Sequence, residues 1–176
     1  MKLKTALKTG LDFSLADFQY IARVPNRHDV KPKEDQIKCA IYRALVDSGH
    51  RVHIEAAYER SGKKCDVRAT RRNNTLWLEI KTGWAGTGGW VNKLREQIAA
   101  WQGDIKRLVR VGEPDQKLFV LFLFTQSGAP CAIRAVDAAR KVGRSHELIL
   151  DSGPTKLPVW NGLDEAQYFV WRIRKA

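Results

Sequence analysis

Residues 117–125 read KLFVLFLFT, a nearly continuous apolar run in the second half of this 176-residue chain. A strand with one face in water alternates apolar and polar residues, whereas a run without alternation is typical of a central strand covered on both faces. We therefore expect an α/β fold, with a mixed central β-sheet flanked by helices. The length suits one domain over residues 1–176 with a sizeable core.

Patterns along the rest of the chain predict the elements around this strand. Helical spacing of Ile37, Ile41 and Leu45 predicts one helix, and short polar connections between the next three strand-like segments predict an antiparallel meander. The apolar strand then follows a long amphipathic helix, so a parallel crossover beside the third meander strand is expected. The predicted elements are helices over 14–24 (capped by Ser14), 34–49, 91–111 and 130–143, and strands over 51–60, 65–72, 75–82, 117–125 and 168–174.

The strand TLWLEIKT, residues 75–82, carries charge on one face only. Side chains alternate along a strand, so Glu79 and Lys81 share a face while leucines and an isoleucine occupy the other. A two-residue turn at 73–74 would place Asp66 of the preceding strand opposite Lys81. Asp66 and Glu79 would then be diagonal neighbours, within reach of a shared ion.

Two carboxylates and a lysine at such proximity have a specific chemical use. The carboxylates can hold a hard cation such as Mg²⁺, which keeps several waters and contacts a phosphate. Such a cation polarises phosphorus and helps to generate a hydroxide-like nucleophile. The lysine can orient that water, lower its pKa or stabilise negative charge on phosphorus.

Asp66 followed by Glu79-Ile80-Lys81 on the next strand of a hairpin resembles the signature of the PD-(D/E)XK (restriction-endonuclease-like) nuclease superfamily. The resemblance covers about residues 33–125, and Cys65 stands where the signature has proline. It implies a restriction-endonuclease-like core and a phosphodiesterase that uses Mg²⁺ or Mn²⁺. It also implies that Asp66, Glu79 and Ile80 hold the metal and that Asp66, Glu79 and Lys81 are catalytic.

Two further features are similar to those of family members. Many members place an acidic residue on the first helix, and Glu34 shares a face with the apolar stripe there, with Asp35 as the alternative. Glu34 is accordingly expected to be a metal ligand and part of the catalytic set. Some branches carry Gln-x-x-x-Tyr on the following helix, which Gln97 and Trp101 resemble. Gln97 is expected to hold a metal-bound water or a DNA phosphate, and Trp101 to anchor the core.

The charge balance favours a polyanionic partner. The chain has 31 Lys and Arg against 19 Asp and Glu, a formal net charge of +12. Nucleic acid is the usual partner of such a surplus, because neutralising phosphates releases counterions. Lys63, Lys64, Arg71 and Arg72 flank the predicted hairpin and are candidate phosphate contacts, with a solvated turn as the alternative.

Other patterns argue against several classes of function. The loop GWAGTGGW lacks the Lys-Ser/Thr of a phosphate-binding loop, so no nucleotide cofactor is expected. The three cysteines contain no CxxC pair, which disfavours structural zinc and suits a reducing cytoplasm. The start of the chain lacks the apolar region of a secretory signal, and no apolar run is long enough for a membrane span.

These features predict a cytoplasmic, Mg²⁺- or Mn²⁺-dependent deoxyribonuclease, expected to be an endonuclease. A homodimer would suit double-strand cutting, because one site cuts one strand. The alternative is a noncatalytic nucleic-acid-binding or assembly module that keeps the nuclease fold. Restriction, junction-resolving, transposition and repair roles are all compatible with the sequence.

Overall fold

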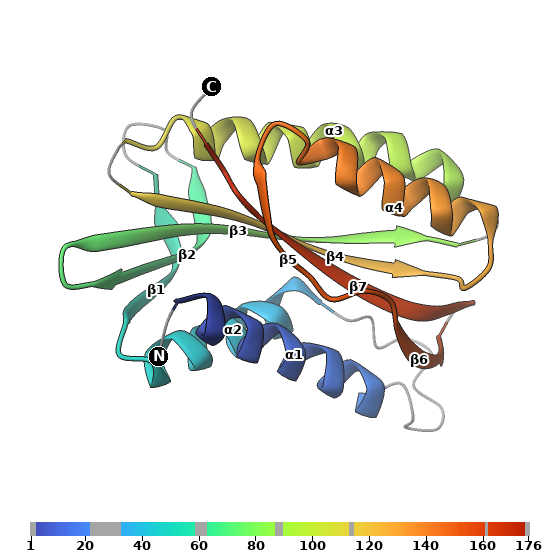
Figure 1. Cartoon of the computed structure of the whole chain (residues 1–176), viewed down its shortest axis with the longest axis horizontal. Coiled ribbons are helices and arrows are strands. Elements are labelled where there is room, and N and C mark those ends of the chain that lie inside the picture. Colours follow the sequence, from blue (N-terminus) through green and yellow to red (C-terminus); the bar gives the residue numbers. More distant parts are fainter. Residues whose placement is uncertain are drawn as a thin grey trace.

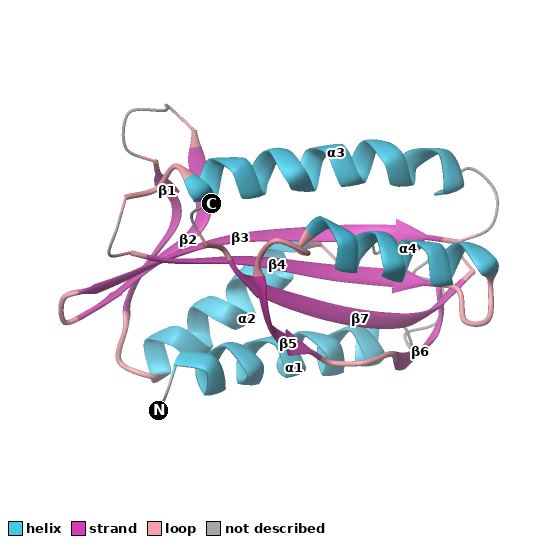
Figure 2. Ribbon diagram, turned by 45° about the horizontal axis from the view of Figure 1, so that its top comes forward, coloured by secondary structure: helices cyan, strands magenta, loops and turns pink. Residues whose placement is uncertain are grey.

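The computed structural model describes residues 3–21, 33–58, 63–86, 90–112, 115–160 and 162–174. A mixed β-sheet lies between two helical layers, with α1 and α2 on one face and α3 and α4 on the other (Figures 1 and 2). The fold class expected from the sequence is therefore present. The elements are α1 (Leu3–Ile21), α2 (Glu34–Asp47), β1 (Arg51–Ala57), β2 (Lys64–Arg71), β3 (Asn74–Ala85), α3 (Trp90–Val109), β4 (Gln116–Thr125), α4 (Pro130–Val142), β5 (Glu147–Asp151), β6 (Thr155–Trp160) and β7 (Leu163–Arg172).

The apolar run forms β4 at the centre of a seven-stranded sheet, as its composition predicts. The strand order is β1-β2-β3-β4-β7-β5, with β6 paired to β7. β3 and β4 are parallel, and α3 makes the crossover between them. Every residue of β4 after Gln116 is buried, because helices cover both sheet faces. This arrangement brings the predicted meander, β1 to β3, to one side of the central strand.

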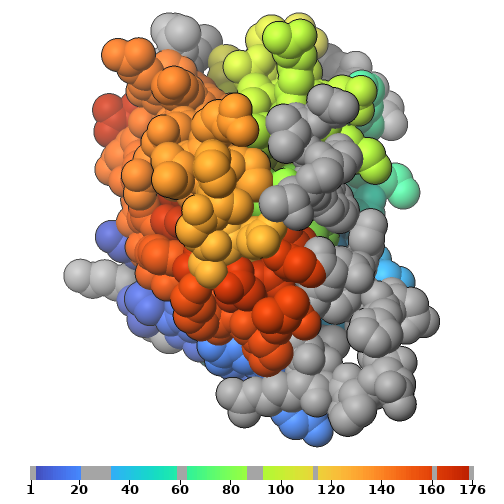
Figure 3. Space-filling view, turned by 90° about the vertical axis from the view of Figure 1, so that its right-hand side faces the viewer, coloured from blue at the N-terminus to red at the C-terminus, as the bar shows by residue number. Residues whose placement is uncertain are grey.

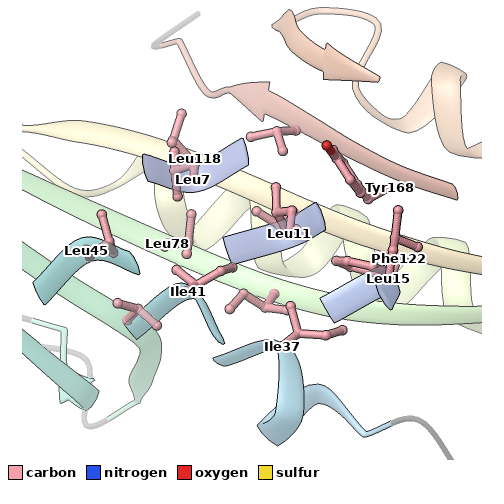
Figure 4. Packing of buried hydrophobic residues seen from close by; sticks show 14 of the residues in the cluster. Leu7, Leu11, Leu15, Ile37, Ile41, Leu45, Leu78, Leu118, Phe122 and Tyr168 are labelled. Atoms are coloured by element: carbon pink, nitrogen blue, oxygen red, sulfur yellow. The ribbon is translucent and has the colours of Figure 1, made fainter. Parts of the chain in front are cut away.

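Helix α1 begins far earlier than the predicted 14–24 helix. It starts at Leu3, and Ser14 lies inside it, buried, with its hydroxyl donating to the Gly10 carbonyl at 3.0 Å rather than capping an end. The helix forms because it buries an apolar stripe at i, i+4 spacing against the sheet. Figure 4 shows this packing between α1, α2 and the strands, with the labelled side chains Leu7, Leu11, Leu15, Ile37, Ile41, Leu45, Leu78, Leu118, Phe122 and Tyr168. Residues 22–24 lie outside the described ranges.

The opposite layer packs α3 directly on β3. Trp101 is 2% exposed, which confirms its predicted place in the core. Its ring rests on Gly83, where an added Cβ would lie 2.6 Å from a ring carbon. Glycine is therefore required at this position for α3 to approach β3 so closely. Figure 3 shows the end of the molecule where α4 lies beside α3, with α1 on the far side of the sheet.

The hydrophobic core extends beyond residues 33–125, the part of the chain that resembles the nuclease superfamily. Strand β7 pairs with β4 along its length and buries Phe169 and Trp171, so it belongs to the same sheet core. It begins at Leu163 rather than at Tyr168, and β5 and β6 add edge strands that the sequence did not predict. Within the described ranges, no helix has the length and apolarity required to cross a membrane.

Candidate active site

The hairpin of β2 and β3 has a register two residues away from the predicted one. Arg71 pairs with Asn74 and Val67 with Leu78, so the turn is Arg72-Asn73 rather than Asn73-Asn74. Continued by one residue, this register sets Asp66 across from Glu79, and the predicted Asp66–Lys81 pairing is wrong. Because the shift is even, every side chain keeps its face of the sheet. The predicted proximity of Asp66, Glu79 and Lys81 therefore survives the error.

Asp66 lies where the paired stretch of β2 and β3 ends. Its Oδ2 accepts a hydrogen bond from the Ile80 backbone N–H at 2.7 Å, so the side chain bonds the β3 backbone just beyond the Val67–Leu78 pair. The same oxygen lies 3.3 Å from the Lys81 ammonium, and Oδ1 lies 2.9 Å from that of Lys38. Burial alone would raise the pKa of Asp66, but Lys81, the Ile80 N–H and Lys38 together lower it below its ordinary value. Asp66 is thus held as a buried anion.

Glu79 is the more deeply buried carboxyl, with its side chain 3% exposed. The Tyr58 hydroxyl donates to its Oε1 at 2.5 Å, and the Lys81 ammonium lies 3.5 Å from Oε2. Burial raises the pKa of Glu79 to about 7, and the negative charge of Asp66 adds to that rise against the opposing Tyr58 and Lys81. The two acids therefore have very different affinities for a proton.

Lys81 is the centre of this cluster. Its ammonium contacts carboxylates from three further elements as well as its own strand, and it also donates to the Ile80 carbonyl at 2.8 Å. The distances from Nζ are 3.3 Å to Asp66, 3.5 Å to Glu79, 3.9 Å to Glu34 and 3.9 Å to Asp104. One positive charge thus sits among four acidic side chains in a partly buried space.

The structure distinguishes between the two candidate helix acids. Glu34, at the start of α2, accepts from the Thr82 backbone N–H at 3.1 Å, which ties α2 to β3 beside Lys81. Asp35 has a side chain that is 81% exposed, and it lies 3.6 Å from Lys38. Glu34 is therefore the acid that reaches the cluster.

Sequence reasoning missed several members of the cluster. Lys38 of α2 bridges Asp66 and Glu55, and Tyr58 follows β1. Asp104 of α3 contacts Lys81 and also pairs with Arg107. A signal for Asp104 was present, since it lies three residues after Trp101 and seven after Gln97 and so shares their helix face. Lys38 had no comparable signal, because its role depends on how α2 sits on the sheet.

Gln97 has partners other than the predicted metal-bound water or phosphate. Its side-chain oxygen accepts from the Trp84 backbone N–H at 3.0 Å, and its amide nitrogen donates to the Trp84 carbonyl at 3.4 Å. This pair of bonds fastens α3 to the end of β3. The phosphate or water contact stays a prediction.

The four predicted phosphate contacts do not gather in one place. Lys63 and Lys64 are exposed near the Asp66 end of β2, whereas Arg71 and Arg72 are exposed at the hairpin tip. Five residues separate Arg71 from Asp66, or about 17 Å along an extended strand. The structure therefore brings only the lysine pair near the acidic cluster.

The cluster suits a divalent cation in donor type. Two buried carboxylates and the Ile80 carbonyl converge on the Lys81 ammonium, and oxygen atoms of this kind are the ligands that a hard cation prefers. Among the described residues, however, no group of three or more His, Cys, Asp or Glu side chains is arranged ready for a metal ion. Lys81 must move for a cation to bind. Comparisons with family models, curated proteins and solved structures find no significant match to this chain.

Proposed function

We propose that this protein is a metal-dependent nuclease of the PD-(D/E)XK class, an endonuclease that hydrolyses DNA phosphodiester bonds with Mg²⁺ or Mn²⁺. The observation that carries the proposal is the convergence of Asp66, Glu79 and Lys81. The Lys81 ammonium lies 3.3 Å from one carboxylate and 3.5 Å from the other. Two carboxylates that can hold a hard cation, with a cationic group beside them, suit the hydrolysis of a phosphodiester.

The donor set assigns each residue a part. Asp66, Glu79, the Ile80 carbonyl and Glu34 would hold the ion, because these oxygens surround the Lys81 ammonium. When bound, the ion supplies charge neutralisation at phosphorus and lowers the pKa of a coordinated water. Lys81, freed from the carboxylates, orients the attacking water or stabilises charge that develops on phosphorus.

Neighbouring groups keep the two acids in place for this task. The Ile80 N–H and Lys38 fix both oxygens of Asp66, and Tyr58 fixes one oxygen of Glu79. Such fixation lets the carboxylates meet a cation without losing side-chain freedom at that moment. Arg107 pairs with Asp104, which lies 3.9 Å from Lys81, so it limits the acidic excess on the α3 side.

The element order supports the assignment of a restriction-endonuclease-like core. A helix, a three-strand meander, a helix and a parallel strand follow one another as α2, β1 to β3, α3 and β4. The acidic cluster lies at the point where the paired stretch of the meander strands ends, beside the N-terminus of α2. The surplus of +12 supports DNA as the partner.

One observation favours the alternative, a noncatalytic nucleic-acid-binding module with the same fold. Lys38 and Lys81 already pair with Asp66 in the structure, so the acids have internal cations as partners. A module that never binds metal would be stabilised by this arrangement as it stands. Metal-stimulated cleavage separates the two functions.

The decisive experiment incubates the protein with supercoiled, linear, single-stranded and branched DNA in Mg²⁺, Mn²⁺ or EDTA. Wild type should cut at least one substrate only with metal, and Asp66→Asn, Glu79→Gln and Lys81→Met should each lower the cleavage rate by about 10²-fold or more. Asp47→Asn, an exposed acid near the end of α2, is the matched control and should cut as wild type does. If wild type cuts none of the four substrates, with or without metal, the binding module is favoured. Unchanged cutting by Lys81→Met would end the proposed mechanism.

A further inference from the structure

The groove between α3 and α4 is a second place where cations gather. It has a volume of about 730 Å³ and lies between the last turns of α3 and the end of α4 with the segment that follows it. Exposed Lys106, Lys141 and Arg144 line it, over an apolar floor of Ile105, Val109 and Val142. Among the described residues, no Asp or Glu lines this groove.

The other cavities differ in charge. The cavity between α1 and α2 includes Asp17, Asp35 and Asp47, and the cavity beside α4 and β7 includes Asp137, Asp151 and Glu165. The net positive charge of the chain is therefore not spread evenly over its hollows. Of these three cavities, only the groove between α3 and α4 offers an anion a lining without opposing carboxylates in the described part of the chain.

The cations of the groove are also uncompensated, unlike their neighbours. Arg140 pairs with Asp151, and Arg172 and Arg174 both pair with Glu147 at 2.9 and 2.7 Å. No ion pair involving Lys106, Lys141 or Arg144 occurs within the ranges that the structure describes. Their charges are available to an outside anion, and exposed cations bind phosphate without the desolvation that a buried pair requires.

The groove adjoins the candidate active site through one helix. Asp104 of α3 contacts Lys81, and Lys106, two residues later, lines the groove. Two residues correspond to about 200° of helical rotation, so the two sites lie on opposite sides of the same turns of α3. The groove therefore offers cations on the side of α3 that is turned away from Lys81.

From these observations we infer that the α3–α4 groove binds the sugar–phosphate backbone of DNA, outside the reacting position. Lys106, Lys141 and Arg144 contact phosphates, and the apolar floor lies against the sugars. The inference rests on the proposed function, since it names where the same DNA substrate is held. Contacts of this kind set affinity and register without reading bases.

Fluorescence anisotropy with a labelled DNA duplex and a labelled single strand, in EDTA, tests this without cleavage. The triple variant Lys106→Ala, Lys141→Ala, Arg144→Ala should bind at least one of the two forms about 10-fold or more weakly. The slope of log K against log [salt] should become shallower by about 2 to 3, because each duplex phosphate contact contributes about 0.9. All three residues are exposed, so the circular dichroism spectrum and melting temperature should stay those of wild type.

The matched control is Lys4→Ala, Lys8→Ala, Arg43→Ala, which removes the same charge from exposed positions on α1 and α2, across the sheet. It should keep nearly wild-type affinity and salt slope. Equal losses of affinity in both triple variants would mean a general charge effect and would overturn the proposed groove site. The same conclusion would follow if the groove variant bound DNA as wild type does, or if wild type did not bind DNA. A groove-dependent loss of binding in a protein that never cleaves would support the groove while ending the nuclease proposal. Metal-dependent cleavage by a protein whose DNA binding does not depend on the groove would support the nuclease proposal and overturn the groove site.

Discussion

Lys38 of α2 and Asp66 of β2 form an ion pair of 2.9 Å, in which the side chains are 11% and 10% exposed. The same ammonium reaches Glu55 at 2.8 Å, so one lysine links α2 to two strands of the meander. Burial opposes the charge on Lys38, yet its bonds to Glu55 and Asp66 raise its pKa far above the ordinary value. Lys38 is thus a fixed positive charge in the site, independent of Lys81.

Replacing this lysine should therefore destabilise the protein when no metal is present. Lys38→Met leaves Asp66 with less compensation in a buried place, and the free energy of unfolding should fall by about 2 to 3 kcal/mol. Urea denaturation in EDTA measures the change. Arg43→Met breaks an exposed i, i+4 pair with Asp47 on the same helix and should change stability by about 0.5 kcal/mol or less. Equal stability of the two variants would show that the buried pair contributes nothing.

Glu79 predicts a pH dependence of stability in metal-free protein. Its pKa is raised from 4.5 to about 7 on folding, so the folded state retains a proton that the unfolded chain releases. The contribution of Glu79 to the free energy of unfolding is fully present below pH 4.5 and is lost as the pH rises through about 7. Glu79→Gln mimics the protonated acid at every pH, so its free energy of unfolding does not change through this group. The free energy of unfolding of wild type relative to Glu79→Gln should thus fall between pH 5 and 8, by at most about 3 kcal/mol.

Chemical denaturation at several pH values in EDTA checks this, with Asp47→Asn as the control for a surface acid. Divalent metal should weaken the trend, because a bound cation stabilises the Glu79 carboxylate and removes its preference for the proton. A constant difference between wild type and Glu79→Gln over pH 5 to 8 would contradict the raised pKa.

The sequence was sufficient for the acidic centre because strand periodicity is robust. Asp66, Glu79 and Lys81 were expected on one side of a hairpin, and they stay there although the turn lies one residue earlier. The turn itself was misplaced because Arg72, rather than an asparagine, takes the left-handed conformation at φ 54°. Asparagine is the more usual residue there, so the Asn-Asn pair gave a misleading preference.

The features that the sequence did not predict depend on how separate elements pack against one another. The stripe of Leu7, Leu11 and Leu15 in α1 is visible in the sequence, but Thr9 and Gly10 within it have weak helix propensity. Packing of the stripe on the sheet therefore decides that the helix forms. Lys38 and Tyr58 reach the acids only because α2 and β1 lie where they do. Such rotations and offsets are set by tertiary packing and are not encoded in local periodicity.

Gln97 provides a prediction that separates a structural role from a chemical one. Gln97→Ala removes both bonds to the Trp84 backbone and should lower the free energy of unfolding by about 1 to 2 kcal/mol. Gln97→Glu keeps an acceptor for the Trp84 N–H and should recover part of that loss. If the side chain also contacts phosphate, the added negative charge of Gln97→Glu should slow cleavage more than Gln97→Ala does. Parallel urea denaturation and cleavage rates distinguish the roles, and a Gln97→Ala protein as stable as wild type would refute the structural one.

Gly83 should tolerate no side chain, because α3 rests on it. An added Cβ would lie 2.6 Å from the Trp101 ring and 3.1 Å from the Leu123 side chain, and both of these residues are buried. Gly83→Ala should therefore lower the free energy of unfolding by about 1 to 3 kcal/mol. Gly103→Ala, on α3 itself, meets only the Arg107 guanidinium at 4.0 Å and should instead stabilise by about 0.5 to 1 kcal/mol through helix propensity. A double-mutant cycle with Trp101→Phe locates the cause: a smaller ring should relieve part of the clash, giving a coupling of about 0.5 kcal/mol or more between the two positions. Strictly additive effects would mean that Gly83 is needed for another reason.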